Sequence, residues 1–205
     1  MKTKRFIKII LGGLIISMML NFSGCGGEKK TTGTFVIELY PEYAPKTVEN
    51  FVKLVKDGFC DGLTFHRVYN GFMAQGGGYD TNDNKKPADS IVGEFASNGY
   101  DANTLSHTHG VISMARTGIP DSASSEFFIC YENALSLDGD YAAFGKVIEG
   151  LEAVDALQEV EKKSGFSIDA VPTTPVKPII IKKMTLLDSD SKNGENPKVK
   201  VEIEY

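Results

Sequence analysis

The sequence predicts a mainly β protein, a closed eight-stranded antiparallel β-barrel capped by two α-helices. Three observations lead to this expectation. Roughly eight short segments have the apolar or alternating pattern of strands, only two segments have helical periodicity, and strands and helices do not alternate along the chain. A doubly wound parallel sheet requires that alternation. A closed antiparallel barrel does not, and closure leaves no strand edge exposed.

The N-terminal residues 1–24 are predicted to be a lipoprotein signal peptide. Four basic residues precede position 9, and an apolar run of 12 residues, 9–20, follows; it is too short to span a membrane as a free-standing anchor. The segment Phe22-Ser23-Gly24-Cys25 resembles a bacterial lipoprotein cleavage site, which makes Cys25 the expected lipidated residue. An ordinary signal peptide or an uncleaved anchor is the alternative. Each of these readings implies export, and the first places the protein at the outer face of the cell membrane.

The net charge of the chain and its motifs argue against several classes of ligand. Without residues 1–24 the chain has 181 residues, 18 Lys and Arg against 27 Asp and Glu, and a net charge of −9. This balance argues against a nucleic-acid partner and against electrostatic binding to anionic lipid. The pair His107 and His109 lacks a third ligand of obvious spacing, and Gly76–Gly78 is not followed by the Lys-Ser/Thr pair of a phosphate loop. We therefore expect neither a metal nor another cofactor.

The first half of the expected domain, 34–188, follows a small, polar tether at 25–33. A strand is predicted at 34–39 from its alternation, and Pro45 opens a helix in which Val48, Phe51, Val52 and Val55 share one face before Gly58 ends it. Two more strands are expected at 63–69 and 72–75.

The second half contains most of the predicted strands. Residues 79–109 are rich in Asn, Asp and Gly and are expected to form a surface loop with one short strand at 91–95. A second amphipathic helix is predicted at 150–160. Three prolines precede a strand at 179–187, and the remaining strands are expected at 111–115, 126–131 and 141–147.

The C-terminal residues 189–205 are assigned to a polar linker followed by an alternating segment, which is expected to be an edge strand or a loose tail. Two cysteines lie in the predicted domain, Cys60 and Cys130. An exported protein permits a disulfide. Nothing in the sequence fixes the distance between these two residues, and two free buried thiols are the favoured interpretation.

Arginine use singles out one stretch. The chain contains 19 lysines and three arginines, and two of the arginines, Arg67 and Arg116, lie in motif-like segments. A chain that otherwise uses lysine is expected to need the planar fork and permanent charge of arginine at these positions. Around Arg67 the sequence reads Phe65-His66-Arg67-Val68, then Gly71-Phe72-Met73-Ala74-Gln75-Gly76-Gly77-Gly78.

This stretch resembles the central signature of the cyclophilins, and four further blocks follow in the family's order. Together the similarity covers about residues 33–187. It implies a peptidyl-prolyl cis-trans isomerase on an eight-stranded barrel. The four blocks are His109-Gly110-Val111-Ile112-Ser113-Met114-Ala115, Ser124-Ser125-Glu126-Phe127-Phe128-Ile129, Leu137-Asp138-Gly139 and Phe144-Gly145-Lys146-Val147.

The implied reaction needs no proton acceptor and no nucleophile. An X-Pro bond interconverts slowly because its C–N resonance must be broken, with a barrier of about 20 kcal/mol. An enzyme needs only to favour the twisted amide, whose proline nitrogen gains a lone pair. A fixed donor that cannot be deprotonated stabilises that lone pair, and Arg67 is the candidate catalytic residue.

The resemblance also implies a substrate-binding set around Arg67. An apolar slot for the proline ring is expected from Phe72, Met73, Phe128 and Leu137, for which plain barrel core is the alternative. Gln75 is expected to hold the substrate backbone or orient Arg67. The backbone of Ala115 and Arg116 is expected to pair with the peptide, and Tyr141 is expected to close the slot. His66 should point away from Arg67 and is expected to support the site.

Four positions depart from the family pattern, and one of them is Tyr141, which occupies the place of a common histidine. Glu126 stands where glutamine is usual, and it is expected either to restrain Arg67 by an ion pair or to weaken its field. Arg116 replaces a common asparagine, with a charge expected to balance Glu126. Ser136 falls where many members have tryptophan, a residue this chain lacks, so inhibition by cyclosporin is expected to be weak.

Two function classes follow. The first is an active isomerase acting on proline-containing peptides and unfolded exported proteins, anchored through an N-terminal lipid and expected to be a monomer. The second is a lipid-anchored module that binds proline-containing peptides with little turnover.

Overall fold

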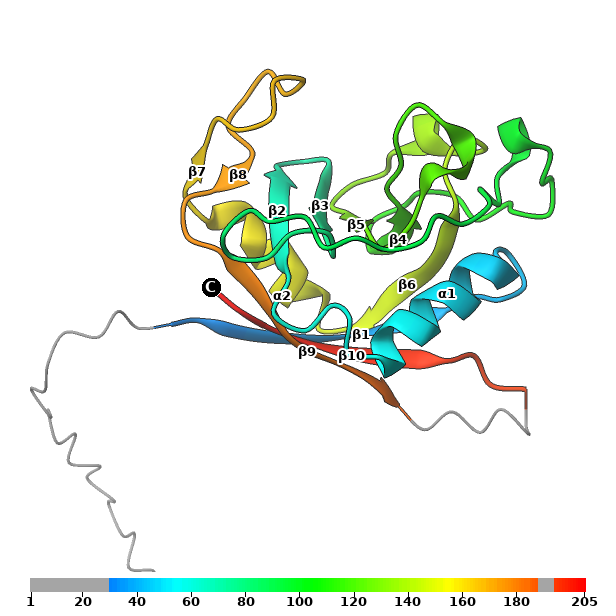
Figure 1. Ribbon diagram of the computed structural model, residues 1–205, viewed down its shortest axis with the longest axis horizontal. Helices are drawn as coiled ribbons and strands as arrows, with labels where there is room; N and C mark the ends of the chain where they lie inside the picture. Colours follow the sequence, from blue (N-terminus) through cyan, green and yellow to red (C-terminus); the bar gives the residue numbers. More distant parts are fainter. Residues whose placement is uncertain (1–29, 188–193) are drawn as a thin grey trace, which may run out of the picture.

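The computed structural model describes residues 30–187 and 194–205. The described residues form ten strands, two α-helices and four short 3₁₀ turns, connected by loops (Figure 1). The strands are β1 Thr32–Leu39, β2 Thr64–Tyr69, β3 Met73–Gly76, β4 Val111–Met114, β5 Phe127–Cys130, β6 Ala143–Glu149, β7 Lys162–Lys163, β8 Thr174–Pro175, β9 Ile179–Leu187 and β10 Lys198–Glu204; the helices are α1 Pro45–Lys56 and α2 Leu151–Asp155.

Eight of the strands close into an antiparallel barrel in the order β1-β10-β9-β2-β3-β5-β4-β6. This confirms the predicted fold class. The helices lie apart from each other on the barrel, α1 against β9 and α2 against β1 (Figure 1). The strand expected at 91–95 is wrong, because Ile91 makes only an isolated bridge to Ala123.

The eighth strand comes instead from the C-terminus. β10 pairs with β1 on one side and with β9 on the other, so it is an interior barrel strand. The expectation of an edge strand or loose tail is therefore wrong. The alternation of β10 places Val199, Val201 and Ile203 in the core while the intervening residues are partly exposed. Its interior place depends on the two strands that flank it, β1 and β9.

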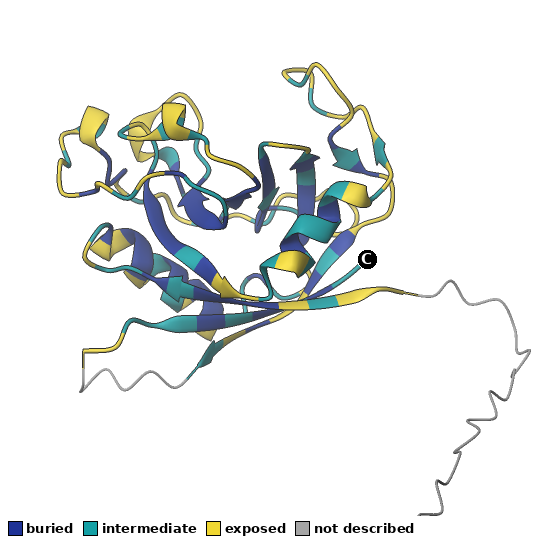
Figure 2. Cartoon of the chain, turned by 180° about the vertical axis from the view of Figure 1, so that it is seen from behind, coloured by how far each residue is buried: buried dark blue, intermediate teal, exposed yellow. Residues whose placement is uncertain are grey.

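The barrel interior is packed with aromatic and branched side chains, which appear as the dark blue faces of the strands in Figure 2. Phe127 from β5 contacts Phe51 of α1 and Phe65 of β2 edge-on, with ring centroids 5.6 and 5.7 Å apart. Such pairs contribute about 0.5–1.5 kcal/mol each beyond burial. Helix α1 thus seals the barrel through the apolar face that the sequence predicts.

The second predicted helix is shorter than expected. Helix α2 ends at Asp155 and continues as a 3₁₀ turn over Ala156–Glu159, with Val154 and Leu157 buried. No helix in residues 30–187 and 194–205 is long and apolar enough to cross a membrane.

Cys60 and Cys130 are both buried and free, as predicted. Burial raises the pKa of each thiol to about 12, which makes both unreactive at neutral pH.

Candidate active site

A register shift in the β2–β3 pair sets the orientation of Arg67. Phe65 lies opposite Gly76 and Arg67 lies opposite Gln75, so His66 is one extra residue on β2. A bulge of this kind re-aims the side chains that flank it. Phe65 is thereby buried in the barrel core while Arg67 stands directly across from the Gln75 amide.

The predicted site residues meet at one cavity of about 350 Å³. Nine of the eleven residues expected to bind or turn over substrate line it, although they come from five separate stretches of the chain. They are Arg67, Phe72, Met73, Gln75, Ala115, Arg116, Phe128, Leu137 and Tyr141.

The apolar part of this cavity is separate from the barrel core. Met73 and Phe128 form a small buried cluster with Cys130, and Phe72 and Leu137 pack against it while remaining partly exposed. Tyr141 closes one side, with its ring edge-on to Phe128 at 6.0 Å. The alternative of plain barrel core therefore does not describe these residues, which instead form a slot that opens outward.

Three hydrogen bonds fix the Arg67 guanidinium. Its Nε and Nη2 donate to the two carboxylate oxygens of Asp169 at 2.8 and 2.5 Å, and its Nη1 donates to Gln75 Oε1 at 3.2 Å. A guanidinium has five N–H groups. Two of them, one on Nη1 and one on Nη2, have no partner among the described residues, and the group that carries them lines the cavity.

Glu126 acts on Arg67 through an intermediary. Gln75 Nε2 donates to Glu126 Oε2 at 3.0 Å, so the Gln75 amide is held at both ends. The expected direct ion pair is wrong, because the partners of the Glu126 carboxylate among the described residues are Gln75, His66 and Lys85. The expected effect of its charge on the field of Arg67 stays a prediction. Glu126 orients Gln75, and Gln75 orients the guanidinium.

The Glu126 carboxylate is itself well held. Burial alone would raise its pKa, but His66 at 3.5 Å and Lys85 at 3.0 Å lower it to about 2. The glycine run explains the close approach, since a Cβ on Gly78 would come within 2.5 Å of the Glu126 side chain. Glu126 is therefore a carboxylate at neutral pH and can only accept from Gln75.

Among the described residues Arg116 makes no ion pair with Glu126. It donates from Nε and Nη2 to the Asp140 carbonyl at 3.0 and 2.8 Å, and it lies over the Tyr141 ring at 4.5 Å. Beside it, the Ala115 N–H donates to the Glu126 carbonyl at 2.9 Å. The Ala115 carbonyl and the Arg116 N–H have no hydrogen-bond partner in the described part of the chain. Such a donor and acceptor suit a peptide added as a strand.

Comparison with known proteins identifies the family. The family model "Cyclophilin type peptidyl-prolyl cis-trans isomerase/CLD" matches residues 28–186. A peptidyl-prolyl cis-trans isomerase of Acinetobacter baylyi is 41% identical over 180 residues, which span 85% of this chain and 93% of the relative. The chain belongs to the cyclophilin family.

Two further relatives agree with this assignment. Peptidyl-prolyl cis-trans isomerase B of Escherichia coli is 34% identical over 163 residues, which span 75% of this chain and 94% of the relative. A crystal structure of a Cryptosporidium parvum cyclophilin-type isomerase, determined in the presence of the dipeptide Ala-Pro, matches with a TM-score of 0.60 and 27% identity. It covers 74% of this chain and 95% of that one.

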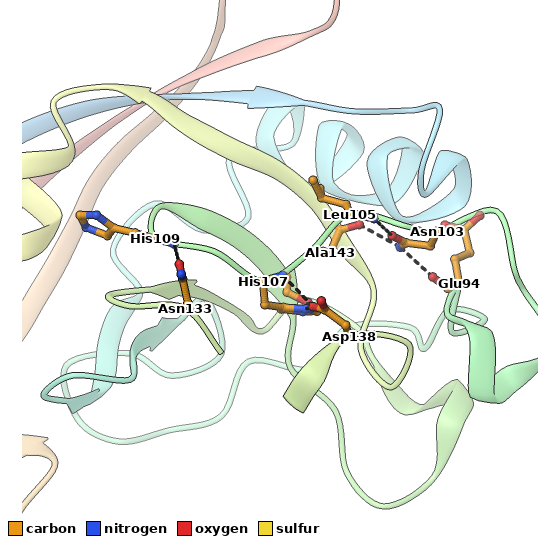
Figure 3. Close-up of polar contacts among 9 residues, drawn as sticks. Glu94, Asn103, Leu105, His107, His109, Asn133, Asp138 and Ala143 are labelled. Atoms are coloured by element: carbon orange, nitrogen blue, oxygen red, sulfur yellow. Dashed lines mark hydrogen bonds and ion pairs between the residues drawn. The ribbon is translucent and has the colours of Figure 1, made fainter. Parts of the chain in front are cut away.

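The two histidines once considered as a metal pair have separate roles in this cyclophilin. His107 is buried, with Nδ1 2.8 Å from Asp138 Oδ1 and Nε2 2.9 Å from Ser113 Oγ. The His109 side chain lies well away from His107 (Figure 3). Its ring Nε2 lies 2.9 Å from Asp155 Oδ1. Within the described residues no three His, Cys, Asp or Glu side chains gather in a metal-binding group.

His107 supports the floor of the proline slot. Its ring stacks on Phe128 at 6.0 Å, and its backbone N–H donates to Asp138, the residue after Leu137. Burial lowers the His107 pKa, although Asp138 opposes that effect. The ring is therefore neutral at physiological pH and packs as an aromatic side chain.

Two predicted binding residues, His66 and Glu126, do not line the cavity. His66 does not point away from Arg67 as expected, because the bulge brings both residues to Phe166. The His66 ring packs between Phe166 and Tyr79, and neither ring nitrogen has a hydrogen-bond partner among the described residues. Its contribution to the site is therefore packing behind Arg67, together with the 3.5 Å contact of its Nε2 with the Glu126 carboxylate.

Sequence reasoning missed Phe166, Ile168 and Asp169. Phe166 and Ile168 line the cavity, and Asp169 holds Arg67. The sequence offered one signal for Asp169. The scarce arginine at position 67 was expected to lie in a site, and a partly buried guanidinium requires an acidic partner. That signal cannot choose between Glu126 and Asp169.

Proposed function

We propose that this cyclophilin isomerises X-Pro bonds in exported proteins and that Arg67 is its catalytic residue. One observation carries the proposal: a fixed guanidinium with two N–H groups that have no partner among the described residues lines the same cavity as an apolar slot. The substrate proline enters the slot, and the guanidinium faces the amide that must twist.

The geometry suits a reaction that moves no proton. As the X-Pro bond rotates, the proline nitrogen becomes pyramidal and its lone pair turns into an acceptor. Arg67 cannot be deprotonated, so its unpartnered N–H groups donate to that lone pair at any physiological pH. A single fixed donor of this kind is worth about 10²–10³ in rate.

The substrate backbone is expected to lie along Ala115 and Arg116, whose unpartnered carbonyl and N–H suit strand addition. The Cryptosporidium parvum relative, crystallised in the presence of Ala-Pro, supports a proline-containing substrate.

The location of the reaction rests on the N-terminal sequence. Residues 1–24 and Cys25 lie outside the described residues. Their basic start, short apolar run and Cys25 support cleavage, lipidation and anchoring at the outer face of the membrane. The clients in that compartment are unfolded exported proteins, and the anchored domain acts on them as a monomer.

A second candidate, a module that binds proline-containing peptides with little turnover, is favoured by Asp169. Its carboxylate neutralises the charge of Arg67 at hydrogen-bonding distance, which weakens the field the proline nitrogen would meet. Low cyclosporin sensitivity, expected from the exposed Ser136, agrees with either candidate.

A protease-coupled assay on a short X-Pro peptide separates the two candidates. Wild-type protein in catalytic amounts is expected to speed relaxation of the cis peptide far above the uncatalysed rate, and Arg67→Ala is expected to remove about 99% of that acceleration. If wild type and Arg67→Ala relax the peptide equally slowly, the protein is a binding module.

A further inference from the structure

We propose that Asp169 is a positioning residue of this isomerase, which sets the plane of the Arg67 guanidinium before substrate arrives. Asp169 lies in an arm, residues 162–175, formed by β7, β8 and the loop between them, which projects beyond β2 (Figure 1). The inference rests on the proposed role of Arg67 and adds a residue 102 positions away in the sequence.

The arm is fastened to the barrel next to Arg67. The Val68 N–H of β2 donates to the Thr173 carbonyl at 2.7 Å, and Thr173 is fully buried. Thr173 Oγ1 in turn donates to Asp169 Oδ2 at 2.6 Å, and the Asp169 N–H donates to the Phe166 carbonyl at 3.1 Å. The carboxylate therefore has a fixed place before it meets the arginine.

The Asp169–Arg67 ion pair is largely buried and is not an exposed surface pair. The Asp169 side chain is 3% exposed and the Arg67 side chain 15%. Exposed ion pairs leave long side chains mobile, whereas a desolvated bidentate pair fixes both position and plane. The Arg67 hydrogen bond lowers the Asp169 pKa, so the carboxylate stays ionised at neutral pH.

Asp169 and Gln75 hold the guanidinium on two sides, as a clamp, and one N–H on each of Nη1 and Nη2 has no partner among the described residues. Asp169 holds the Nε and Nη2 edge and Gln75 holds Nη1, while the Phe166 ring lies 5.7 Å from the central carbon. An unrestrained arginine loses considerable side-chain freedom when it engages a transition state. Here that ordering is complete in the resting protein, which is the condition under which a fixed donor is effective.

The first test measures kcat and KM separately for Asp169→Ala, Asp169→Asn and wild type. Asp169→Ala is expected to lower kcat about tenfold and to leave KM within twofold, because the proline slot is intact. Asp169→Asn keeps one acceptor oxygen and is expected to lower kcat about threefold. The matched control is Asp61→Ala. It removes a carboxylate that accepts hydrogen bonds from Lys183 and from the Met184 N–H, and Asp61 does not line the cavity. It should change kcat by less than twofold.

The second test distinguishes positioning from general support of the fold. In an Arg67→Lys background the fork is gone, so Asp169→Ala is expected to change turnover by less than twofold. The ¹⁵Nε–H resonance of Arg67, assigned by its disappearance in Arg67→Lys, is expected to exchange slowly in wild type and to broaden or vanish in Asp169→Ala. That resonance reports on the clamp without any turnover.

Several results would overturn the inference. A kcat of Asp169→Ala at or above wild type would mean that the carboxylate only quenches Arg67. An equal loss in the Arg67→Lys background would mean that Asp169 acts through the fold, and an unchanged Arg67 resonance in Asp169→Ala would show that no clamp exists. Arg67→Ala with wild-type activity would refute the proposed function itself, whatever Asp169 does.

Discussion

Arg67 owes its orientation to groups from distant parts of the chain. Gln75 comes from the neighbouring strand and Asp169 from the arm, and Glu126 on β5's N-terminal side holds Gln75 in place. The position of Arg67 and most of the slot could be predicted. Arg67 and Gln75 lie in one short motif on the paired strands β2 and β3, and most of the other lining residues lie in the blocks that resemble the cyclophilins. Asp169 was not predictable, since its meeting with Arg67 depends on how the arm is fastened.

The lowered pKa of Glu126 predicts how the stability of the fold depends on pH in acid. Its value of about 2 in the folded protein is below the ordinary 4.5, so the carboxylate stabilises the fold fully above about pH 4.5 and loses that contribution as the pH falls toward 2. The measurement is the free energy of unfolding of wild type minus that of Glu126→Gln, by urea titration between pH 2 and 7.

We expect this difference to be constant from pH 5 to 7 and to shrink by about 1–2 kcal/mol between pH 4.5 and 2, an amount reduced from the full shift because the site is partly solvated. A difference that does not depend on pH would show that the contacts with Lys85 and His66 do not stabilise the charge.

Strand β10 shows what alternation can and cannot predict at the scale of an element. The sequence of 198–205 has the strand period, and the structure confirms a strand there. Whether such a strand lies at an edge or between two others depends on partners far along the chain, here β1 and β9. Conversely, residues 91–95 resemble a strand locally but have no partner beyond one bridge.

Removal of β10 is therefore expected to unfold the domain, even though the family match ends at residue 186. Three of its side chains are fully buried, each worth about 1.5–3 kcal/mol, and its loss opens the barrel between β1 and β9. A chain ending at residue 197 should show no cooperative thermal transition. The Val201→Asp variant should lose most of its free energy of unfolding. The Lys200→Ala variant, on the same strand, should keep a free energy of unfolding within about 0.5 kcal/mol of wild type. A truncated chain with wild-type thermal stability would contradict this role.

At the scale of the whole molecule, the acidic domain and its N-terminal segment suggest a catalyst held at a surface by lipid and not by charge. Without residues 1–24 the net charge is −9, which disfavours adsorption to anionic membranes. Under the proposed lipid anchor, attachment to the membrane depends on Cys25.

Cys25→Ser tests this attachment. Wild type is expected in the membrane fraction of the producing bacterium and to take up labelled fatty acid, because acyl chains contribute about 0.8 kcal/mol per buried CH₂. The variant is expected to lose the label and, if it is still processed, to move to the soluble exported fraction. Wild type found unlabelled and soluble would indicate an ordinary signal peptide, and an unlabelled membrane-bound wild type would indicate an uncleaved anchor.

The central claim is that Arg67 accelerates rotation and does not merely help to bind. Exchange NMR on an equilibrium mixture of cis and trans X-Pro peptide measures both properties in one sample, through chemical-shift changes on binding and exchange cross-peaks on turnover. Strong exchange peaks are expected with wild type. With Arg67→Ala we expect a peptide affinity within about threefold of wild type but exchange reduced about a hundredfold. Undiminished exchange in Arg67→Ala would show that Arg67 is not the catalytic residue.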